Sequence, residues 1–387
     1  YLFDKDGKRQ KPVTQGDWEV RSVYTTDLKD GFVYFSATRD GSTGLNLYRC
    51  KTDGTGIERL TKGEGAHAVT VSPTGSLFID TTSDSKTPTH VRLWKTGGGE
   101  PARTLDANPV YAREEYKFGA YDRVQVKTRD GFVMEGSLVT PPDFDPSKKY
   151  PVWLMTYAGP HMPSVRDGWD GGRLMDQAIA GAGVVVCRID PRSASGKGAC
   201  SAWTAYKQLG VQELKDLEDA VDWLTTNSWV DASRIGLSGH SYGGFMTAFA
   251  LTHSKKFAAG IAGAPVTDWR NYDSIYTERY MSTPQENPQG YDATSVVKAA
   301  KNLHGRLLLL HGEMDDNVHV QNTLQLIDEL QKAEKDFEVM IYPRARHGLG
   351  RGSQRQIVQF ILKTMTGVEP KLPASGPPVG PRPKGRR

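Results

Sequence analysis

Ser241 stands in a segment whose glycines and spacing suit a nucleophilic serine. The segment GHSYG (239–243) fits the pattern G-x-S-x-G, with apolar residues before it at 235–237 and small or apolar residues after it at 245–250. This context predicts a strand, a sharp turn and a helix, with the Ser241 hydroxyl exposed at the turn. The flanking glycines are expected because larger side chains would collide with the neighbouring strand and helix. The alternative is a glycine-rich turn with an uninvolved serine.

A serine hydroxyl needs an adjacent base to act as a nucleophile, and a third group must orient that base. In α/β-hydrolases the order along the chain is serine, then aspartate or glutamate, then histidine. Downstream of Ser241, the apolar segment 306–310 ends in HGEMDDNV (311–318), and the segment 339–342 ends in PRARHG (343–348). Open α/β sheets place their sites just past strand carboxyl ends, so both loops are expected at the site.

These two loops supply a base and an acid, with competitors for each role. We assign His347 as the general base and acid, and Asp315 as the residue that orients it. Asp316 adjoins Asp315, and spacing alone does not choose between the two carboxylates. His311 precedes the acid and is expected to be structural. His240 is next to the nucleophile but is expected to face away from it.

The tetrahedral intermediate of acyl transfer needs two donors for its oxyanion. The backbone N–H of Tyr242, the residue after the nucleophile, is one expected donor. The other should come from the loop after the strand expected at 152–156, where the sequence is YAGP (157–160) rather than a glycine-rich run. Pro160 has no N–H, so the Tyr157 hydroxyl is the candidate donor. The alternative for Tyr157 is a packed loop aromatic.

An aromatic segment, PVTDWRNYDSIY (265–276), follows another expected strand end and should border the site. Trp269, Tyr272 and Tyr276 could wall a compact apolar pocket, and aromatic faces pack well against a rigid pyrrolidine ring. The alternative is ordinary aromatic packing.

Strands and helices alternate from residue 151 onward, which predicts an α/β domain with a mostly parallel sheet. Apolar runs that read as strands lie at 152–156, 183–189, 234–238, 257–262, 306–311 and 337–342. Alternating residues around the turn at 130–131 predict an earlier strand pair within 121–139. Helical spacing joins Val211, Leu214, Leu217, Val221 and Leu224, with Glu213, Lys215, Asp216 and Asp219 expected to face water. Similar spacing marks helices around 324–330 and 357–361.

Residues 1–105 carry a weak repeat. DGFVYF (30–35) recurs as TGSLFI (74–79), and LYRCKT (47–52) recurs as VRLWKT (91–96), each 44 residues apart. VTQG (13–16) recurs as LTKG (60–63). A period of about 40–50 residues with short strands indicates β-propeller blades, of which about two are visible. The alternative is a β-sandwich.

The predicted domains are therefore a propeller portion at 1–105, an α/β-hydrolase domain with its connector at 106–368, and a disordered basic Pro/Gly-rich tail at 369–387. The first residue is Tyr1, so we expect the chain to be part of a longer protein whose leader would lie upstream.

Bulk properties exclude some classes of function. The longest apolar runs fall short of the roughly 18 residues of a membrane span. The net charge is +4, with much of it in the final KGRR, so nucleic-acid binding is not expected. No Cys/His spacing predicts a metal site, and no cofactor is expected. Cys187 should be a buried thiol, and a disulfide with Cys200 is possible but not indicated.

Together these segments resemble the dipeptidyl peptidase IV branch of the prolyl oligopeptidase family. The resemblance is carried by TYAGP (156–160), GHSYGG (239–244), APVTDWRNYDSIYTERYM (264–281), HGEMDDNVH (311–319), RHG (346–348) and, in the repeat, LTKGEGAH (60–67). Such proteins join an α/β-hydrolase domain to a β-propeller, with the active site between them.

The resemblance implies a charge relay of Ser241, Asp315 and His347, which favours Asp315 over Asp316. It implies the Tyr157 hydroxyl and the Tyr242 N–H as oxyanion donors.

The resemblance also implies how substrate binds. A proline-accepting pocket would be formed by Tyr242, Val266, Trp269, Tyr272, Tyr276 and Val318. Asn317 would bind a carbonyl of the substrate backbone. A homodimer through the hydrolase domain and a secreted or periplasmic location are likewise implied.

Two features depart from the family pattern. Residues 1–105 contain no glutamate pair of the kind with which dipeptidyl peptidases hold the free amine of the substrate. The segment DPRSASG (190–196) stands where the family commonly has D-x-R-G-x-G. Both departures concern exopeptidase specificity and substrate access rather than serine hydrolysis.

The sequence thus predicts a serine peptidase that cleaves peptides after proline or alanine and releases N-terminal dipeptides, with the propeller admitting peptides rather than folded proteins. One alternative is a broader oligopeptidase or acylaminoacyl-peptidase of the same family. Others are a carboxylesterase and a non-catalytic interaction protein that uses the propeller as a scaffold.

Overall fold

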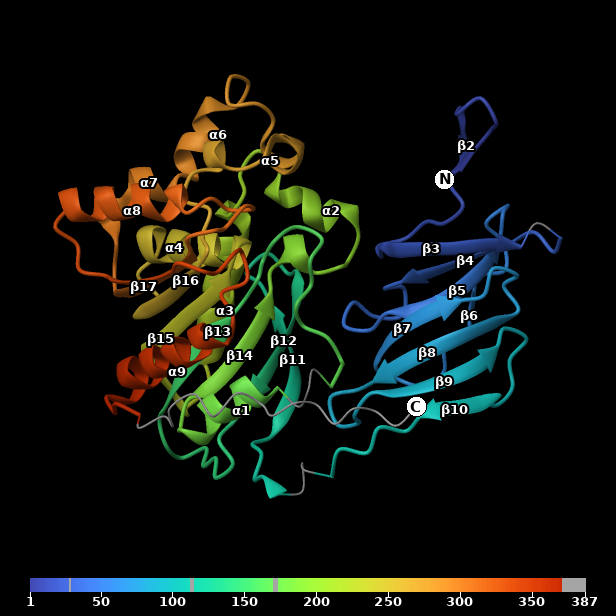
Figure 1. Ribbon diagram of the computed structural model, residues 1–387, viewed down its shortest axis with the longest axis horizontal. Helices are drawn as coiled ribbons and strands as arrows, with labels where there is room; N and C mark the ends of the chain where they lie inside the picture. Colours follow the sequence, from blue (N-terminus) through green and yellow to red (C-terminus); the bar gives the residue numbers. More distant parts are fainter. Residues whose placement is uncertain (28, 112–114, 170–172, 371–387) are drawn as a thin grey trace.

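The computed structural model describes residues 1–27, 29–111, 115–169 and 173–370. Figure 1 shows two lobes side by side, joined by the chain that follows β10. The N-terminal lobe consists of strands, and the C-terminal lobe is a sheet covered by helices. Residues 371–387 of the expected tail, and 112–114 of the expected connector, lie outside the described residues. No helix among the described residues is both long and apolar enough to cross a bilayer.

The N-terminal lobe contains two four-stranded antiparallel sheets, as expected for propeller blades. The first comprises β3 (Val20–Asp27), β4 (Phe32–Ala37), β5 (Asn46–Lys51) and β6 (Glu58–Arg59), and the second comprises β7 (Ala66–Val71), β8 (Leu77–Ser83), β9 (His90–Lys95) and β10 (Arg103–Asp106). The repeated segments form the second and third strands of each sheet. The turn glycines before β4 and β8, Gly31 and Gly75, both have a φ of 69°, a left-handed conformation that favours glycine. A short pair, β1 (Leu2–Phe3) and β2 (Arg9–Lys11), precedes them.

An eight-stranded sheet forms the centre of the C-terminal lobe in the part of the chain that the structure describes. Its order is β11-β12-β14-β13-β15-β16-β17-β18. The strands are β11 (Tyr121–Lys127), β12 (Val133–Val139), β13 (Tyr150–Met155), β14 (Val185–Asp190), β15 (Val230–His240), β16 (Ala259–Gly263), β17 (Arg306–Gly312) and β18 (Glu338–Tyr342). β13 to β18 pair in parallel, and β11 and β12 are antiparallel at one edge. The predicted α/β-hydrolase sheet is thus confirmed.

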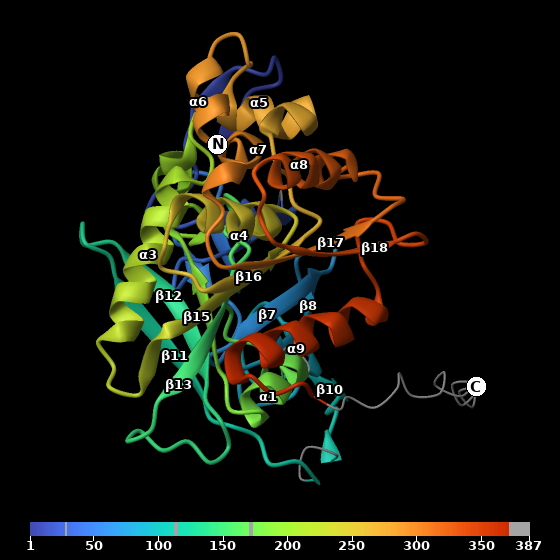
Figure 2. The ribbon, with the colours of Figure 1, turned by 90° about the vertical axis from the view of Figure 1, so that its left-hand side faces the viewer.

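Alternate strand residues enter two cores, one on each face of this sheet. On one face, Leu154 and Leu237 belong to a core that includes residues of α3 (Val211–Thr225), α4 (Tyr242–His253) and α8 (Gln321–Lys332). On the other face, Trp153 and Val186 pack with α1 (Leu174–Gly181) and α9 (Arg351–Thr366). Figure 2 shows α1 and α9 on one side of the sheet and α3 on the other. The shorter helices are α2 (Ala199–Ala202), α5 (Ser274–Met281), α6 (Pro288–Ala293) and α7 (Val296–Ala299).

The polar face of α3 differs from the prediction. Glu213, Asp216 and Asp219 do not face water, because their exposed fractions are 0%, 0% and 7%. The Arg192 guanidinium donates to Asp216 at 2.8 Å, and the Arg129 Nε donates to Asp219 at 2.5 Å. Helical periodicity identifies polar positions but cannot show that cations from distant segments cover them.

Polar contacts join the two lobes. The Thr38 hydroxyl, directly after β4, donates to the Gly196 carbonyl at 2.8 Å, and the Asp167 N–H donates to the Thr43 carbonyl at 2.9 Å. The Asp167 carboxylate accepts the Ser85 N–H at 3.1 Å. The loops that carry Gly196 and Asp167 follow β14 and β13, so these contacts tie the blades to the loops beside the carboxyl ends of the central strands.

The cysteines are free thiols. Cys187 is buried in β14, as predicted, and burial raises its pKa to about 12. Cys50 is also buried, and Cys200 is exposed.

Candidate active site

Ser241 occupies a strained turn between β15 and α4. Its φ and ψ are 60° and −117°, a conformation that a residue with a side chain rarely adopts. The Ser241 N–H donates to the Gly263 carbonyl at 2.8 Å, and the Ser241 carbonyl accepts the Phe245 N–H at 2.9 Å. These bonds hold the turn between strand and helix, and the Ser241 side chain stands at the carboxyl end of the central strand.

The neighbouring glycines leave room for this turn. A Cβ at Gly239 would lie 2.5 Å from the Gly243 backbone. A Cβ at Gly243 would lie 2.5 Å from the Thr156 carbonyl oxygen, and one at Gly244 would lie 2.3 Å from that of Gly263. Backbone atoms cannot yield to such approaches, so glycine is required by packing at these positions.

His347 contacts the buried carboxylate of Asp315. His347 Nδ1 lies 2.8 Å from Asp315 Oδ2, and the Asp315 side chain is buried. Asp315 Oδ1 accepts the backbone N–H groups of Asn317 and Val318, each at 3.0 Å. These contacts hold the Asp315 carboxylate in place against the His347 imidazole. With Nδ1 donating to Asp315, His347 Nε2 is free to accept a proton.

The competing residues differ from Asp315 and His347 in their surroundings. Asp316 forms an exposed ion pair with Arg346 at 2.6 Å. His311 is fully buried: its Nε2 lies 2.8 Å from the Val318 carbonyl and 3.3 Å from Asp315 Oδ2, and its Nδ1 lies 2.7 Å from the Thr323 hydroxyl. Burial lowers the pKa of His311, so it remains a neutral side chain that fixes the loop after β17.

His240 packs against His347 next to the serine turn. The two imidazole rings lie 4.8 Å apart between centroids. Burial, together with the nearby His347, lowers the pKa of His240. The contact is not evident from the sequence, because it joins the ends of β15 and the loop after β18. It places His347 against the residue that precedes Ser241.

The Tyr157 hydroxyl also reaches the serine. Burial raises the pKa of Tyr157, and a hydrogen bond with Ser241 partly opposes that rise. The Tyr157 and Tyr242 rings lie 6.1 Å apart. Ala158, the next residue, has a φ of 64°, which turns the chain sharply after β13. The structure thus brings the Tyr157 hydroxyl and the serine turn together.

Asp190 supports the loop that carries Tyr157. Its carboxylate accepts the Ser164 N–H at 2.8 Å, the Ser164 hydroxyl at 2.6 Å and the Val165 N–H at 2.7 Å. Burial raises the pKa of Asp190 to about 6, and these hydrogen bonds oppose the rise. The first residue of the unusual DPRSASG segment therefore has a defined role in holding this loop.

Aromatic rings gather beside the serine turn. Trp269 lies 5.5 Å from Tyr242 and stacks on Tyr276 at 6.1 Å, and Tyr272 lies 5.5 Å from Tyr276. The Tyr272 hydroxyl donates to Asn317 Oδ1 at 2.8 Å. The structure brings these predicted pocket residues together, and Val266 and Val318 are buried in the same core as Tyr242 and Trp269.

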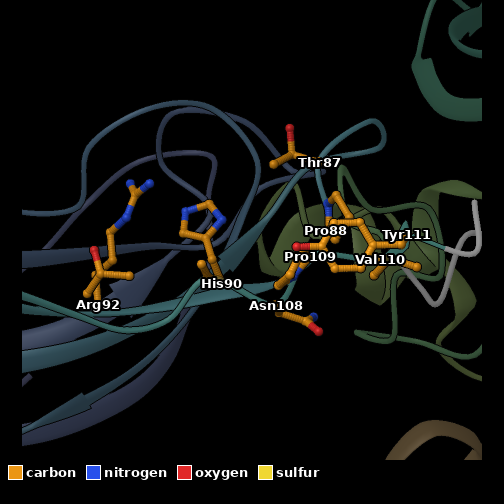
Figure 3. Close-up of a pocket in the computed structure, with 10 residues that line it drawn as sticks. Thr87, Pro88, His90, Arg92, Asn108, Pro109, Val110 and Tyr111 are labelled. Atoms are coloured by element: carbon orange, nitrogen blue, oxygen red, sulfur yellow. The ribbon is translucent and has the colours of Figure 1, made fainter.

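Of two hollows in the structure, one borders the serine turn and the other does not. One of about 660 Å³ is lined by residues that include His90 and Arg92 of β9 and Pro109 and Tyr111 of the segment 107–111 (Figure 3). It contains none of the predicted site residues. Another, of about 440 Å³, lies against the serine turn and is lined by residues that include Tyr157, Gly239, His240, Met155 and Leu310.

The sequence analysis gives no role in the site to Glu213, Asp190 or His240, although Glu213 contacts Tyr242, His240 contacts His347 and Asp190 holds the loop after Tyr157. Glu213 and Asp190 are buried carboxylates whose partners lie far away in sequence. An acidic residue on the expected solvent face of a helix carries no local sign of such a partner.

Comparisons with known proteins show the family to which this fold belongs. The prolyl oligopeptidase family matches residues 173–366, and the dipeptidyl peptidase IV N-terminal region matches residues 1–89. Dipeptidyl-aminopeptidase B of Aspergillus niger is 34% identical over 367 residues, covering 92% of this chain and 41% of that protein. The crystal structure of Porphyromonas gingivalis dipeptidyl peptidase 4 superposes with a TM-score of 0.88 and 34% identity, covering 94% of this chain and 52% of that one.

The chain therefore spans about 40% of the length of the curated relative and about half of the solved structure. The family match covers the sheet strands that carry Ser241, Asp315 and His347. With its blades, its α/β-hydrolase sheet and these matches, the chain belongs to the prolyl oligopeptidase family.

Proposed function

We propose that this protein is a serine peptidase that cleaves peptides after proline or alanine and releases N-terminal dipeptides. The observation that carries the proposal is the contact of His347 with the buried Asp315 beside the strained Ser241, next to a cluster of aromatic rings. The names of the matched relatives, which are dipeptidyl peptidases, support the same activity.

In this proposal Ser241 Oγ attacks the carbonyl carbon of the scissile bond while His347 Nε2 takes its proton. His347 becomes an imidazolium, which the Asp315 carboxylate stabilises at Nδ1. The Tyr157 hydroxyl and the Tyr242 N–H donate to the oxyanion of the tetrahedral intermediate. His347 then gives its proton to the leaving amine, and an acyl-enzyme forms on Ser241. Water, deprotonated by the same imidazole, completes hydrolysis.

The aromatic cluster accounts for the proposed preference for proline or alanine as the substrate residue before the cleaved bond. In this proposal a pyrrolidine ring packs against the partly buried rings of Tyr272 and Tyr276, behind which Trp269, Tyr242, Val266 and Val318 form a buried apolar layer. Asn317 Oδ1 is already occupied by the Tyr272 hydroxyl, so its amide Nδ2 is left to donate to a substrate carbonyl.

The test compares Gly-Pro-p-nitroanilide, its N-blocked counterpart and a matched ester. The proposal predicts hydrolysis of the free-amine anilide and little hydrolysis of the blocked one. Hydrolysis of the blocked anilide at an equal rate would instead indicate a broader oligopeptidase. Hydrolysis of the ester alone would indicate a carboxylesterase and would contradict the peptidase proposal.

We further propose, on the resemblance, that the protein forms homodimers through its C-terminal lobe and works in a secreted or periplasmic location. Sedimentation equilibrium should give a particle mass twice the chain mass of 42.7 kDa. A particle mass equal to that of one chain at all protein concentrations would contradict the dimer. Fractionation of the native cells should place the activity outside the cytoplasm; activity confined to the cytoplasmic fraction would contradict the location.

A further inference from the structure

A buried carboxylate lies beneath the proposed oxyanion site and takes no part in the reaction described above. Glu213, in the first turn of α3, has an exposed fraction of 0%. The Tyr242 hydroxyl donates to Glu213 Oε1 at 3.0 Å, and the Gly210 N–H donates to Glu213 Oε2 at 3.0 Å. Tyr242 is itself 3% exposed, so its hydroxyl depends on this partner. Leaving a buried hydroxyl without a partner costs about 1–3 kcal/mol.

The same carboxylate also reaches the loop of the second proposed donor. The Ser193 hydroxyl lies between Glu213 and the Ala158 carbonyl, which is 3.2 Å from it, and its one proton is donated to one of the two at a time. The Ser193 carbonyl accepts the His161 N–H at 2.9 Å. Ala158 directly follows Tyr157. Glu213 therefore stands between the residue after the nucleophile and the loop that carries the Tyr157 hydroxyl.

The surroundings of Glu213 suit a carboxylate that accepts several hydrogen bonds rather than one that forms an ion pair. Asp216, one turn later on α3, is bound by Arg192, so that guanidinium is engaged elsewhere. Tyr242 and Tyr276 are the phenols that face Glu213 from α4 and α5. Burial is the main cause that raises the pKa of Glu213 to about 7. A carboxyl in such a place is a costly choice for packing alone.

We propose that Glu213 is a positioning residue for the oxyanion site. Its carboxylate fixes Tyr242 and, through Ser193, the Tyr157 loop, so that the Tyr242 N–H and the Tyr157 hydroxyl converge on one oxyanion. The inference rests on the proposed function, because it assigns Glu213 a part in the same acyl transfer.

The test uses Glu213→Gln, Tyr242→Phe and the double variant, with Asp219→Asn as a matched control. Asp219 is a buried acid on the same helix, but it binds Arg129 instead of the site. In Glu213→Gln, one of the two accepting oxygens is replaced by an amide NH₂, which cannot accept, so at least one of the donors to Glu213 loses its partner. The readouts are kcat and KM for Gly-Pro-p-nitroanilide, with melting temperatures for every variant.

Glu213→Gln should lower kcat about tenfold to a hundredfold, less than the 10²–10³-fold loss of a whole oxyanion donor, while KM changes less than about threefold. Tyr242→Phe should lower kcat similarly. The kcat of the double variant should be no lower than that of the less active single variant, because the two substitutions break the same contact. Asp219→Asn should lower the melting temperature without lowering kcat. If Glu213→Gln does not fold, Tyr242→Phe tests the same contact from its other end.

Three results would overturn the inference: an unchanged kcat in Glu213→Gln or in Tyr242→Phe, an equal loss of kcat in Asp219→Asn, or independent losses that multiply in the double variant. Reaction of the wild type with a fluorophosphonate separates this failure from that of the proposed function. A wild type that does not become labelled at Ser241 would overturn the serine peptidase proposal and the inference together. A labelled wild type with unaffected Glu213 variants would overturn the inference alone.

Discussion

At the scale of single residues, the site depends on hydroxyls and carboxylates that have specific partners. Ser241, Asp315 and His347 could be predicted because their order along the chain and their places after strands are recurrent in α/β-hydrolases. Spacing alone did not choose between Asp315 and Asp316, and the resemblance favoured Asp315; in the structure Asp315 contacts His347, whereas Asp316 is paired with Arg346. Glu213 could not be predicted, because its periodicity matches that of a solvent-facing acid.

Tyr157→Phe tests the oxyanion role of the phenol. The variant keeps the ring against Tyr242 and removes only the hydroxyl that reaches Ser241. We expect kcat for Gly-Pro-p-nitroanilide to fall about 10²–10³-fold, with a smaller change in KM. An unchanged kcat would leave Tyr157 as a packing residue. Tyr342→Phe, at the end of β18, is a control that should retain activity.

Glu213 should also make stability depend on pH. Its pKa is about 7 in the folded chain against an ordinary value of 4.5, so the folded chain binds this proton more tightly than the unfolded chain. The stabilising contribution is therefore complete below pH 4.5 and is lost as pH rises through 7. Its size is on the order of 3 kcal/mol. The difference in free energy of unfolding between wild type and Glu213→Gln should change by that order between pH 4.5 and 7.5, and a constant difference would contradict the prediction.

At the scale of elements, the parallel strands bring residues far apart in sequence to one edge of the sheet. β13, β15, β16, β17 and β18 each end in a loop that supplies a site residue. Apolar runs predicted these strands to within a few residues, because strands buried on both faces read as continuous apolar segments. The support of the Tyr157 loop by Asp190 could not be predicted, since it depends on contacts between loops.

Gly243→Ala tests the close approach of α4 to the end of β13. A methyl group would lie 2.5 Å from the Thr156 carbonyl oxygen, directly before Tyr157, and must displace strand or helix. We expect loss of turnover and destabilisation of about 2 kcal/mol or more, measured by urea unfolding. Gly181→Ala, in α1, meets nothing within 4 Å and should be neutral or stabilising by up to about 1 kcal/mol. Equal effects of the two substitutions would contradict this account.

At the scale of the whole molecule, the blades and the hydrolase sheet meet at the loops that support the site. The 44-residue repeat predicted the blade strands because each sheet repeats the same turn before its second strand. The sequence could not predict which residues join the lobes, since hydrogen bonds such as Asp167 to Thr43 and Ser85 involve backbone groups, which every residue has.

Asp167→Ala should weaken the contact between the lobes. It removes the acceptor of the Ser85 N–H and the partner of Arg123, which lies 3.3 Å from Asp167. We expect a loss of about 1–3 kcal/mol in the free energy of unfolding and faster amide exchange at Ser85. Asp143→Ala removes an exposed ion pair with Lys117 and should cost under about 1 kcal/mol. Equal losses would mean that the Asp167 contact does not hold the lobes together.

The most direct test of the central claim is kcat/KM for Gly-Pro-p-nitroanilide in Asp315→Asn beside Asp316→Asn, with Ser241→Ala as the inactive reference. The neighbouring aspartates differ in that only Asp315 contacts His347. We predict a loss of about 10⁴-fold for Asp315→Asn, because the imidazole loses the partner that fixes its tautomer. Asp316→Asn should stay within about twofold of wild type, and Ser241→Ala should show no turnover. A reversed order of the two aspartates, or wild-type turnover by Ser241→Ala, would contradict the account.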